Sequence, residues 1–177
     1  MALNSVKYGD YQFNGIFSVA EKELTSKKFK MENDKVVSEL NDLLTKNYDA
    51  EKGYKEAAEK IEHRALKSYF ESQAQNRYDF GHKIKELIAK YGGTPDKGTS
   101  LAGDLHRTWI AIRSAFATGD QAIYEECIRG EETFSEEYGE VLNDTNLPQD
   151  VRDMVRKQKD SVDRALVALR TMEDFAS

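Results

Sequence analysis

The sequence has little that would build a covalent or cysteine-based framework. It contains one cysteine and two prolines in 177 residues. A single cysteine excludes an intrachain disulfide and a cysteine-based zinc site. Cys127 has apolar neighbours on a predicted helix, so we expect it to pack in a core. The scarcity of proline leaves long helices uninterrupted.

Long apolar runs are also missing. No stretch approaches the roughly 18–20 residues that cross a membrane, and no basic segment followed by an apolar one marks a signal peptide. We therefore expect a cytoplasmic protein with no membrane partner. The formal net charge of −6 argues against nucleic acid as a partner, because phosphates require a basic face.

What the chain does have is helical periodicity. Charged residues make up 33% of it and hydrophobic residues 39%, a balance typical of solvated helices around one apolar core. From residue 33 onward, apolar side chains recur every three or four positions over four ranges: 36–61, 66–91, 123–142 and 151–175. Gly92-Gly93, with Pro95 just beyond, ends the second range.

The connections between these ranges predict how the helices are arranged. Short turns join the first helix to the second and the last two helices to each other, so each pair forms an antiparallel hairpin. A longer connection between the hairpins contains a shorter helix that bears Trp109. Two hairpins with one long crossover is the ferritin-like connectivity. The predicted fold class is therefore all-α, a ferritin-like four-helix bundle with an extra crossover helix and an N-terminal arm.

The N-terminal arm comprises residues 1–31, and the bundle domain residues 32–177. The arm is rich in aromatic residues and contains a short helical piece, whereas an acidic sequence suited to a helix start begins at Glu32. Three interpretations of the arm stay open. It packs on its own bundle or on a neighbouring subunit, it docks another partner, or it is an extension foreign to the domain.

Each long helix carries polar residues where its apolar face should continue. We call this set the polar layer: Asn47, Gln73, Asn76, Glu131 and Gln158. Ferritin-type bundles hold two metal ions with one Glu from each of two helices and a Glu-x-x-His from each of the others. The chain contains no Glu-x-x-His, and its polar layer is mostly amide, so no metal site is expected. If a divalent ion binds nonetheless, its ligands come from Glu131, Glu51, His106 and Asp79.

Glu131 itself has two interpretations. Buried beside Phe134 it could act as a general acid or base, but no nucleophile, cofactor motif or phosphate-binding loop accompanies it. Alternatively, it accepts hydrogen bonds from the amides of Asn47, Asn76 or Gln158 and only fixes the register of the helices. On this second interpretation, Glu131→Gln should leave stability unchanged or slightly higher.

The stretch from Ser100 to Trp109 also has two interpretations. His106 and Arg107 could grip an anion at the mouth of the crossover, or His106 could ligate a lone metal ion. The alternative is a capped helix start whose Trp109 anchors the crossover on the bundle.

Several short motifs are similar to those of one bacterial family. They are Leu40-Asn41-Asp42-Leu43-Leu44, Gly53-Tyr54-Lys55-Glu56-Ala57-Ala58, Tyr91-Gly92-Gly93, Ser100-Leu101-Ala102-Gly103, Leu105-His106-Arg107 with Trp109, and Glu125-Glu126-Cys127 with Arg129-Gly130-Glu131. In their order and spacing, the chain resembles an uncharacterised family of ferritin-like four-helix-bundle proteins, a domain of unknown function. The resemblance covers roughly residues 35–172 and implies the ferritin-like fold, but no established activity.

Three classes of function remain open. The first is a non-enzymatic bundle for interaction, assembly or stress, with a degenerate ferritin-type metal site, which forms a homo-oligomer or binds a protein partner through the N-terminal arm. The second is a divergent metal-binding relative that holds a single divalent ion. The third is a small-molecule pocket lined by the polar layer and by Tyr54 or Tyr138. No catalytic residue and no cofactor is predicted.

Overall fold

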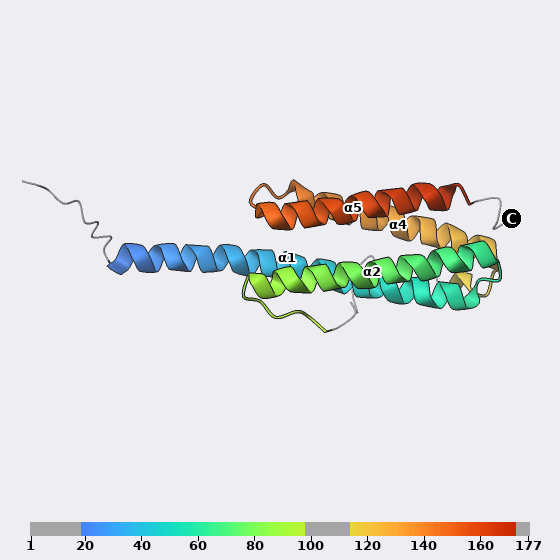
Figure 1. Ribbon diagram of the computed structural model, residues 1–177, viewed down its shortest axis with the longest axis horizontal. Coiled ribbons are helices and arrows are strands. Elements are labelled where there is room, and N and C mark those ends of the chain that lie inside the picture. The colour runs from blue at the N-terminus through green and yellow to red at the C-terminus, as the bar shows by residue number, and fades with distance from the viewer. Residues whose placement is uncertain (1–18, 98–113, 173–177) are drawn as a thin grey trace, which may run out of the picture. The chain divides into compact units, whose positions relative to one another are not determined.

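The computed structural model describes residues 19–97 and 114–172. In these ranges it has four long helices and no strand (Figure 1): α1 (Val19–Lys60), α2 (Arg64–Lys90), α4 (Asp120–Asn143) and α5 (Gln149–Arg170). The predicted all-α four-helix fold is confirmed. None of these helices combines the length and the apolar character that crossing a membrane requires. The helix expected around Trp109 lies outside the described residues.

Helix α1 begins earlier than the sequence predicted. It starts at Val19 and continues to Lys60, so the helix start expected at Glu32 is wrong. The reason is that neither glycine nor proline occurs from Val19 to Lys52, and the stretch is rich in Glu, Lys and Leu, which favour helix. Contacts divide the chain into two compact units, residues 1–32 and 33–177. That residues 1–31 can be removed without unfolding the bundle stays a prediction.

The end of α2 is fixed by the two glycines that the sequence identified. Gly92 has φ +79, a left-handed conformation that residues with a Cβ adopt at a cost. The N–H of Gly93 donates to the Ile88 carbonyl at 2.9 Å, and that of Gly92 to the Ala89 carbonyl at 3.1 Å. This pair of bonds is a Schellman motif, which satisfies the last carbonyls of the helix.

Two sets of contacts establish the order of the helices in the bundle. The Asp120 carboxylate at the start of α4 accepts hydrogen bonds from the backbone N–H groups of Glu62 and His63, at 3.1 and 3.0 Å. Asp150 at the start of α5 accepts from Lys90 at 2.6 Å and from Tyr91 at 2.7 Å. Therefore α4 begins where α2 begins, and α5 begins where α2 ends. Helices α2 and α4 therefore run in the same direction, as expected for two hairpins, α1 with α2 and α4 with α5; the middle of the connection between them, residues 98–113, lies outside the described residues.

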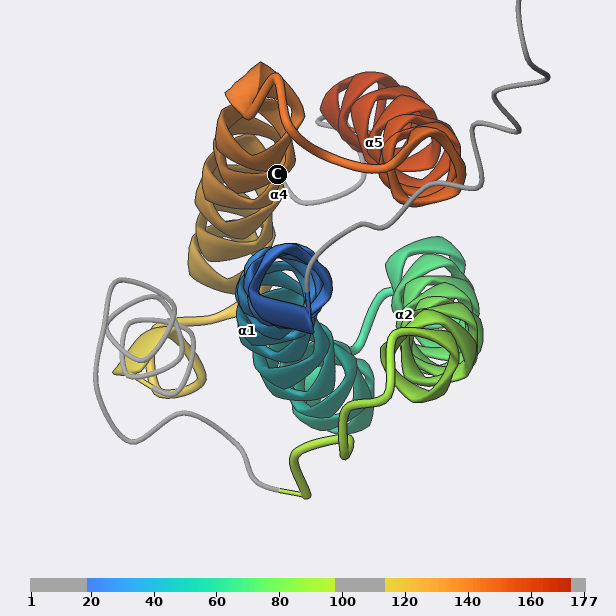
Figure 2. The same cartoon turned by 90° about the vertical axis from the view of Figure 1, so that its left-hand side faces the viewer.

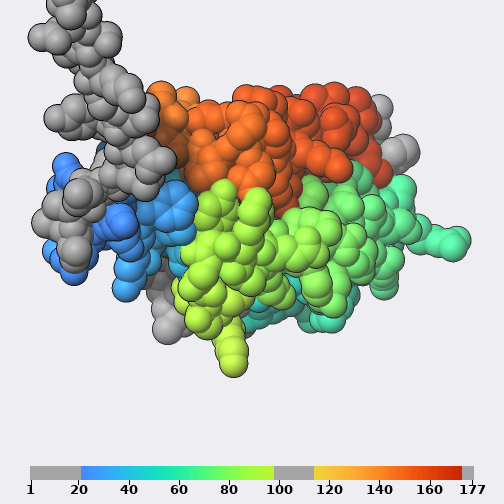
Figure 3. Space-filling model, turned by 60° about the vertical axis from the view of Figure 1, so that its left-hand side comes forward, coloured from blue at the N-terminus to red at the C-terminus, as the bar shows by residue number. Residues whose placement is uncertain are grey.

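Seen end-on, the four helices occupy the corners of a bundle (Figure 2). Helix α4 lies beside α1, where Lys46 and Glu137 form an ion pair at 3.1 Å. Helix α5 lies beside α2, where the Tyr69 hydroxyl donates to the Ala165 carbonyl at 2.6 Å (Figure 3). Helices α2 and α4 therefore face each other across a diagonal of the bundle.

The apolar core of residues 33–172 consists of two clusters. One contains residues from the middle of α1 and the second part of α2, with Phe134, Tyr138 and Val155. The other contains residues from the end of α1 and the start of α2, with Cys127 and Leu169. Along α4, Glu131 falls between Cys127 of one cluster and Phe134 of the other. The polar layer thus lies where the two clusters meet.

Gly93 allows the turn after α2 to pass close to α1. A Cβ built on Gly93 would lie 2.4 Å from Cγ1 of Val37 and 2.7 Å from its Cγ2, and a β-branched side chain has few alternative rotamers. Gly93→Ala should therefore lower the free energy of unfolding by about 1–2 kcal/mol. Gly139→Ala on α4 is the matched control, because its nearest atom, Cε of Lys159, is 3.6 Å away. There alanine should be neutral or slightly stabilising in urea unfolding. Equal stability of both variants would contradict the close approach.

Candidate functional site

Most of the polar layer is buried. Asn47 is fully buried, Gln73, Glu131 and Gln158 are 7%, 3% and 4% exposed, and Asn76 is half-buried. The structure brings these residues to one level of the bundle, but it does not join them as the sequence suggested. No amide of the polar layer donates to Glu131 in the hydrogen bonds of the described residues.

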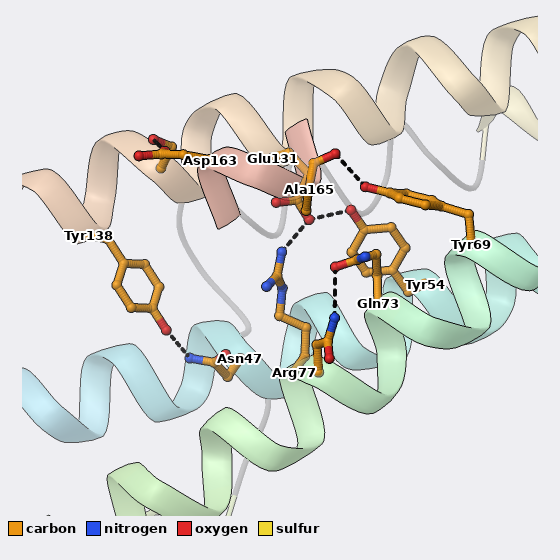
Figure 4. A network of polar contacts seen from close by, with 11 residues as sticks. Asn47, Tyr54, Tyr69, Gln73, Arg77, Glu131, Tyr138, Asp163 and Ala165 are labelled. Carbon is orange, nitrogen blue, oxygen red and sulfur yellow. Dashed lines mark hydrogen bonds and ion pairs between the residues drawn. The ribbon is translucent and has the colours of Figure 1, made fainter. Parts of the chain in front are cut away.

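Glu131 instead forms an ion pair with Arg77, a residue of α2 that the sequence analysis did not single out. Nη2 of Arg77 donates to Oε1 of Glu131, and the hydroxyl of Tyr54 on α1 donates to the same oxygen (Figure 4). Arg77 is 1% exposed. The three side chains come from α1, α2 and α4, and the ion pair spans the α2–α4 diagonal. We call Tyr54, Arg77 and Glu131 the ion-pair triad.

Aromatic rings surround the guanidinium of Arg77. Its Cζ lies 4.8 Å from the ring centroid of Phe134, 5.5 Å from that of Phe80 and 5.8 Å from that of Tyr54. Such contacts stabilise a cation through the negative face of each ring. Burial alone would lower the pKa of Arg77, but the charge of Glu131 and the nearby tyrosines reverse this, and the net pKa is raised. The guanidinium therefore stays charged inside the core.

The ion-pair triad leaves several polar atoms without a protein partner. Within the described part of the chain, three of its buried atoms have no hydrogen-bond partner: the donors Nε and Nη1 of Arg77 and the acceptor Oε2 of Glu131. A buried ion pair compensates for its lost hydration only when its remaining polar atoms are also bonded. The pair is therefore a weak net stabiliser, although each charge alone would be very unfavourable in this place.

A second set of hydrogen bonds links all four helices. The Tyr138 hydroxyl on α4 donates to Oε1 of Gln158 on α5 at 2.7 Å and accepts from Nδ2 of Asn47 on α1 at 3.0 Å. Nε2 of Gln158 donates to the Phe80 carbonyl on α2 at 3.3 Å. Asn47 also donates to the Leu43 carbonyl at 2.8 Å. Tyr138 thus takes the position between the amides that the sequence analysis gave to Glu131.

The candidate metal ligands are not brought together. Glu51 pairs with Lys55 at 2.5 Å, Asp79 is exposed and accepts from Gln75 at 3.0 Å, and Glu131 pairs with Arg77. Across residues 19–97 and 114–172, no three His, Cys, Asp or Glu side chains gather in a way that could hold a metal ion. His106 lies outside the described residues, as does Arg107.

The neighbouring groups are poorly suited to nucleophilic or acid–base chemistry. Burial, and then the charge of Glu131, raise the pKa of Cys127 far above its ordinary value, so its thiol stays protonated and unreactive. The same two causes raise the pKa of Tyr54. A neutral tyrosine that donates a hydrogen bond to a carboxylate keeps its own proton, holds that carboxylate in place and is not available as a base.

A serine, a lysine and an aspartate also meet between α4 and α5. Oγ of Ser135 donates to Oδ1 of Asp163 at 2.5 Å and accepts from Nζ of Lys159 at 2.9 Å. Lysine can activate serine when it takes the serine proton, but here that proton points to Asp163. Nζ of Lys159 also donates to both Asp163 oxygens, at 3.0 and 2.9 Å. The cluster links the two helices and leaves neither the nucleophile nor the base free.

A groove of about 440 Å³ lies between α1 and α2. Its lining is mostly charged or polar: Lys55, Ala58, Glu59, Lys67, Glu71, Ala74, Gln75 and Tyr78. No residue of the polar layer lines it, and the two tyrosines expected in a ligand pocket, Tyr54 and Tyr138, are buried in hydrogen bonds to other side chains. The groove therefore does not correspond to the small-molecule pocket that the sequence suggested.

The buried tyrosines predict how stability depends on alkaline pH. Burial, and then bonding to Asp150, raise the pKa of Tyr91 to about 12, and burial raises those of Tyr54, Tyr69 and Tyr138 further. A raised folded-state pKa gives stability that is complete below the unfolded value of about 10 and is lost as the pH rises beyond it. Tyrosinate absorbance of these residues should therefore appear together with loss of helical circular dichroism. Ionisation of all nine tyrosines near pH 10 with the helices intact would contradict this.

A family model described as Domain of unknown function (DUF2383) matches residues 35–144. The match runs from α1 to the residue after α4, so it contains the whole ion-pair triad, while α5 with Gln158 lies beyond it. No curated protein matches the chain.

Proposed function

This chain belongs to the family described as Domain of unknown function (DUF2383), and we propose that it is a non-enzymatic helical bundle that acts by assembling with other protein chains. The observation that carries the proposal is the pairing of Glu131 with Arg77. Glu131 is the one carboxylate buried among the described residues, and a cation from the same chain already neutralises it. Because Glu131 is already bonded to Arg77, the core provides neither a free carboxylate to bind a metal ion nor a carboxylic acid that could transfer a proton.

The bundle is then ferritin-like, with a degenerate metal site. In ferritin-type bundles, carboxylates and histidines from four helices surround two cations. In this chain the guanidinium of Arg77 supplies the positive charge at the level of the polar layer. The other buried polar side chains at this level are amides and tyrosines. Hard metal ions need several anionic oxygens, which a single carboxylate already bonded to arginine and tyrosine does not provide.

An assembly role is supported by what the chain exposes. Three of the five large hydrophobic side chains that are exposed among the described residues, Leu24, Phe29 and Met31, occur within eight positions of α1. Leu24 and Met31 are seven residues apart and share one face of the helix, and neighbouring apolar side chains on a surface are typical of protein contacts. We place this activity in the cytoplasm.

Metal analysis tests the proposal. Protein purified without chelator should contain far less than one iron, manganese or zinc atom per chain, and its melting temperature should not rise when these ions are added. Glu51→Gln should behave like the wild type in both measurements, because Glu51 pairs with Lys55 and is not part of the ion-pair triad. A stoichiometric metal ion that raises the melting temperature would instead favour the divergent metal-binding protein.

A further inference from the structure

Three charged side chains meet where α1 passes the end of α4. Nζ of Lys35 lies 2.7 Å from Oδ2 of Asp144 and 3.6 Å from Oε1 of Glu39. Lys35 and Glu39 are on α1, whereas Asp144 directly follows α4. One ammonium group therefore faces two carboxylates, and the cluster joins the hairpin of α1 and α2 to that of α4 and α5.

The position of Asp144 is fixed by its own turn and by α5. Its Oδ1 accepts from the N–H of Asn146 at 2.8 Å, and its backbone carbonyl accepts from Nη2 of Arg152 at 2.6 Å. Nη1 of Arg152 donates to the Leu142 carbonyl at 2.9 Å. Both of these guanidinium nitrogens thus bond backbone carbonyls. Within the described ranges, Lys35 is the cation that pairs with the two carboxylates.

The segment that follows α2 also contacts this part of α1. The N–H of Asp96 donates to Oδ1 of Asn41 at 2.9 Å, while the side chain of Asp96 is exposed. Among the residues that the structure describes, the charged groups that act on Glu39 are Asp144 and Lys35. The protonation of Glu39 is therefore governed by this cluster and by its burial.

Glu39 is the member of the cluster whose charge is least compensated. Its Oε2 is buried and has no hydrogen-bond partner in the described residues. Burial, and then the charge of Asp144, raise the pKa of Glu39. Lys35 acts in the opposite sense, but it is 60% exposed, so water screens its charge. Hydrogen bonds from Lys35 and from the N–H of Asn146 lower the pKa of Asp144 to about 2. Glu39 therefore takes up a proton first as the pH falls.

A proton on Glu39 changes what the two carboxyl groups can do to each other. Two carboxylates are both acceptors and repel, whereas a protonated carboxyl group donates to a carboxylate in a short, charge-assisted hydrogen bond. Glu39 and Asp144 are within reach of such a bond, since hydrogen bonding between them contributes to the pKa shifts of both. The proton thus replaces a repulsion with an attraction.

We propose that Glu39 and Asp144 share one proton in mildly acidic solution, and that this carboxyl pair is a clasp between the two hairpins that tightens as the pH falls. The folded state binds this proton more tightly than the unfolded chain does. The stability that the clasp adds is therefore complete below the ordinary glutamate pKa of 4.5 and is lost as the pH rises through the raised value. This device is independent of the assembly role proposed above.

Glu39→Gln in the full chain tests the clasp, because glutamine carries a permanent donor in place of the shared proton. In urea unfolding at pH 7.5 this variant should have a higher midpoint than the wild type, and the difference should shrink at pH 5. Glu86→Gln is the matched control. Glu86 is 65% exposed and pairs with Lys83 at the surface of α2, so its effect should be small and equal at both pH values. A difference between Glu39→Gln and the wild type that does not shrink would overturn the proposal.

Carbon-13 NMR of the side-chain carboxyl groups locates the proton. The Glu39 signal should titrate at a higher pH in the folded protein than in the chain unfolded in urea. Asp144→Asn should move this titration to lower pH, because asparagine removes the neighbouring charge and offers Glu39 a donor. A Glu39 titration that is the same in the folded and unfolded chain, or that Asp144→Asn leaves in place, would overturn the proposal. These outcomes do not depend on metal content or oligomeric state, so they leave the proposed function untouched.

Discussion

Glu131→Ala should lower the free energy of unfolding by about 3–5 kcal/mol, the usual effect of removing one partner from a buried ion pair. Arg77 would keep its charge in a site that is 1% exposed, with no carboxylate to bond it. The Tyr54 hydroxyl would also lose its acceptor. The aromatic rings around the guanidinium offset only part of this loss. Urea unfolding at neutral pH measures the change.

The structure reverses the expectation for Glu131→Gln. If only amides bonded Glu131, a glutamine would be neutral or slightly stabilising, as the sequence suggested. Because Arg77 is the true partner, glutamine removes the charge that compensates the guanidinium, and we expect a loss of about 3 kcal/mol. Glu51→Gln is the control and should change stability by less than about 1 kcal/mol, since its ion pair with Lys55 is at the surface. A stable Glu131→Gln protein would contradict the assigned pairing.

Tyr138→Phe should cost about 2–3 kcal/mol. The ring would still fill its fully buried position, but Oε1 of Gln158 would lose its donor and Nδ2 of Asn47 one of its two acceptors. Each buried polar group left unpaired costs about 1–3 kcal/mol. The loss should appear as a lower midpoint of urea unfolding.

Tyr78→Phe is the matched control for that substitution. Tyr78 is on α2 and 47% exposed, so water can replace whatever its hydroxyl contacts, and the variant should unfold within about 0.5 kcal/mol of the wild type. If both phenylalanine variants were equally stable, the hydrogen bonds of Tyr138 would not hold the four helices together.

The fold could be predicted because its determinants are local. Apolar residues repeat every three or four positions, and Gly92-Gly93 ends α2 through its own backbone. The start of α1 was missed because an acidic sequence at Glu32 favours a helix start without preventing the helix from extending upstream. In the absence of glycine or proline, the preceding residues simply continue the helix.

The candidate site was only half predictable. The polar layer was visible as interruptions of each apolar face, but Arg77 was overlooked because arginine is usually exposed. The signal was present: Leu66, Phe70, Gln73 and Arg77 follow the spacing that places α2 side chains in the core. Which buried groups bond each other depends on helix rotation and on the diagonal pairing of α2 with α4. A single sequence does not encode these relations in any local pattern.

The central claim is that Arg77 and Glu131 neutralise each other in the core, and the most direct test of it is a double-mutant cycle at residues 77 and 131. Arg77→Met and Glu131→Met should each cost about 3–5 kcal/mol of unfolding free energy, whereas the double variant should lie within about 1–2 kcal/mol of the wild type. Replacing both partners removes two buried charges together, along with the polar atoms that lack partners. A double variant that recovers most of the stability lost by either single one is the result we predict. If the double variant instead lost the sum of the two single losses of unfolding free energy, the two charges would not stabilise each other, and the account would be contradicted.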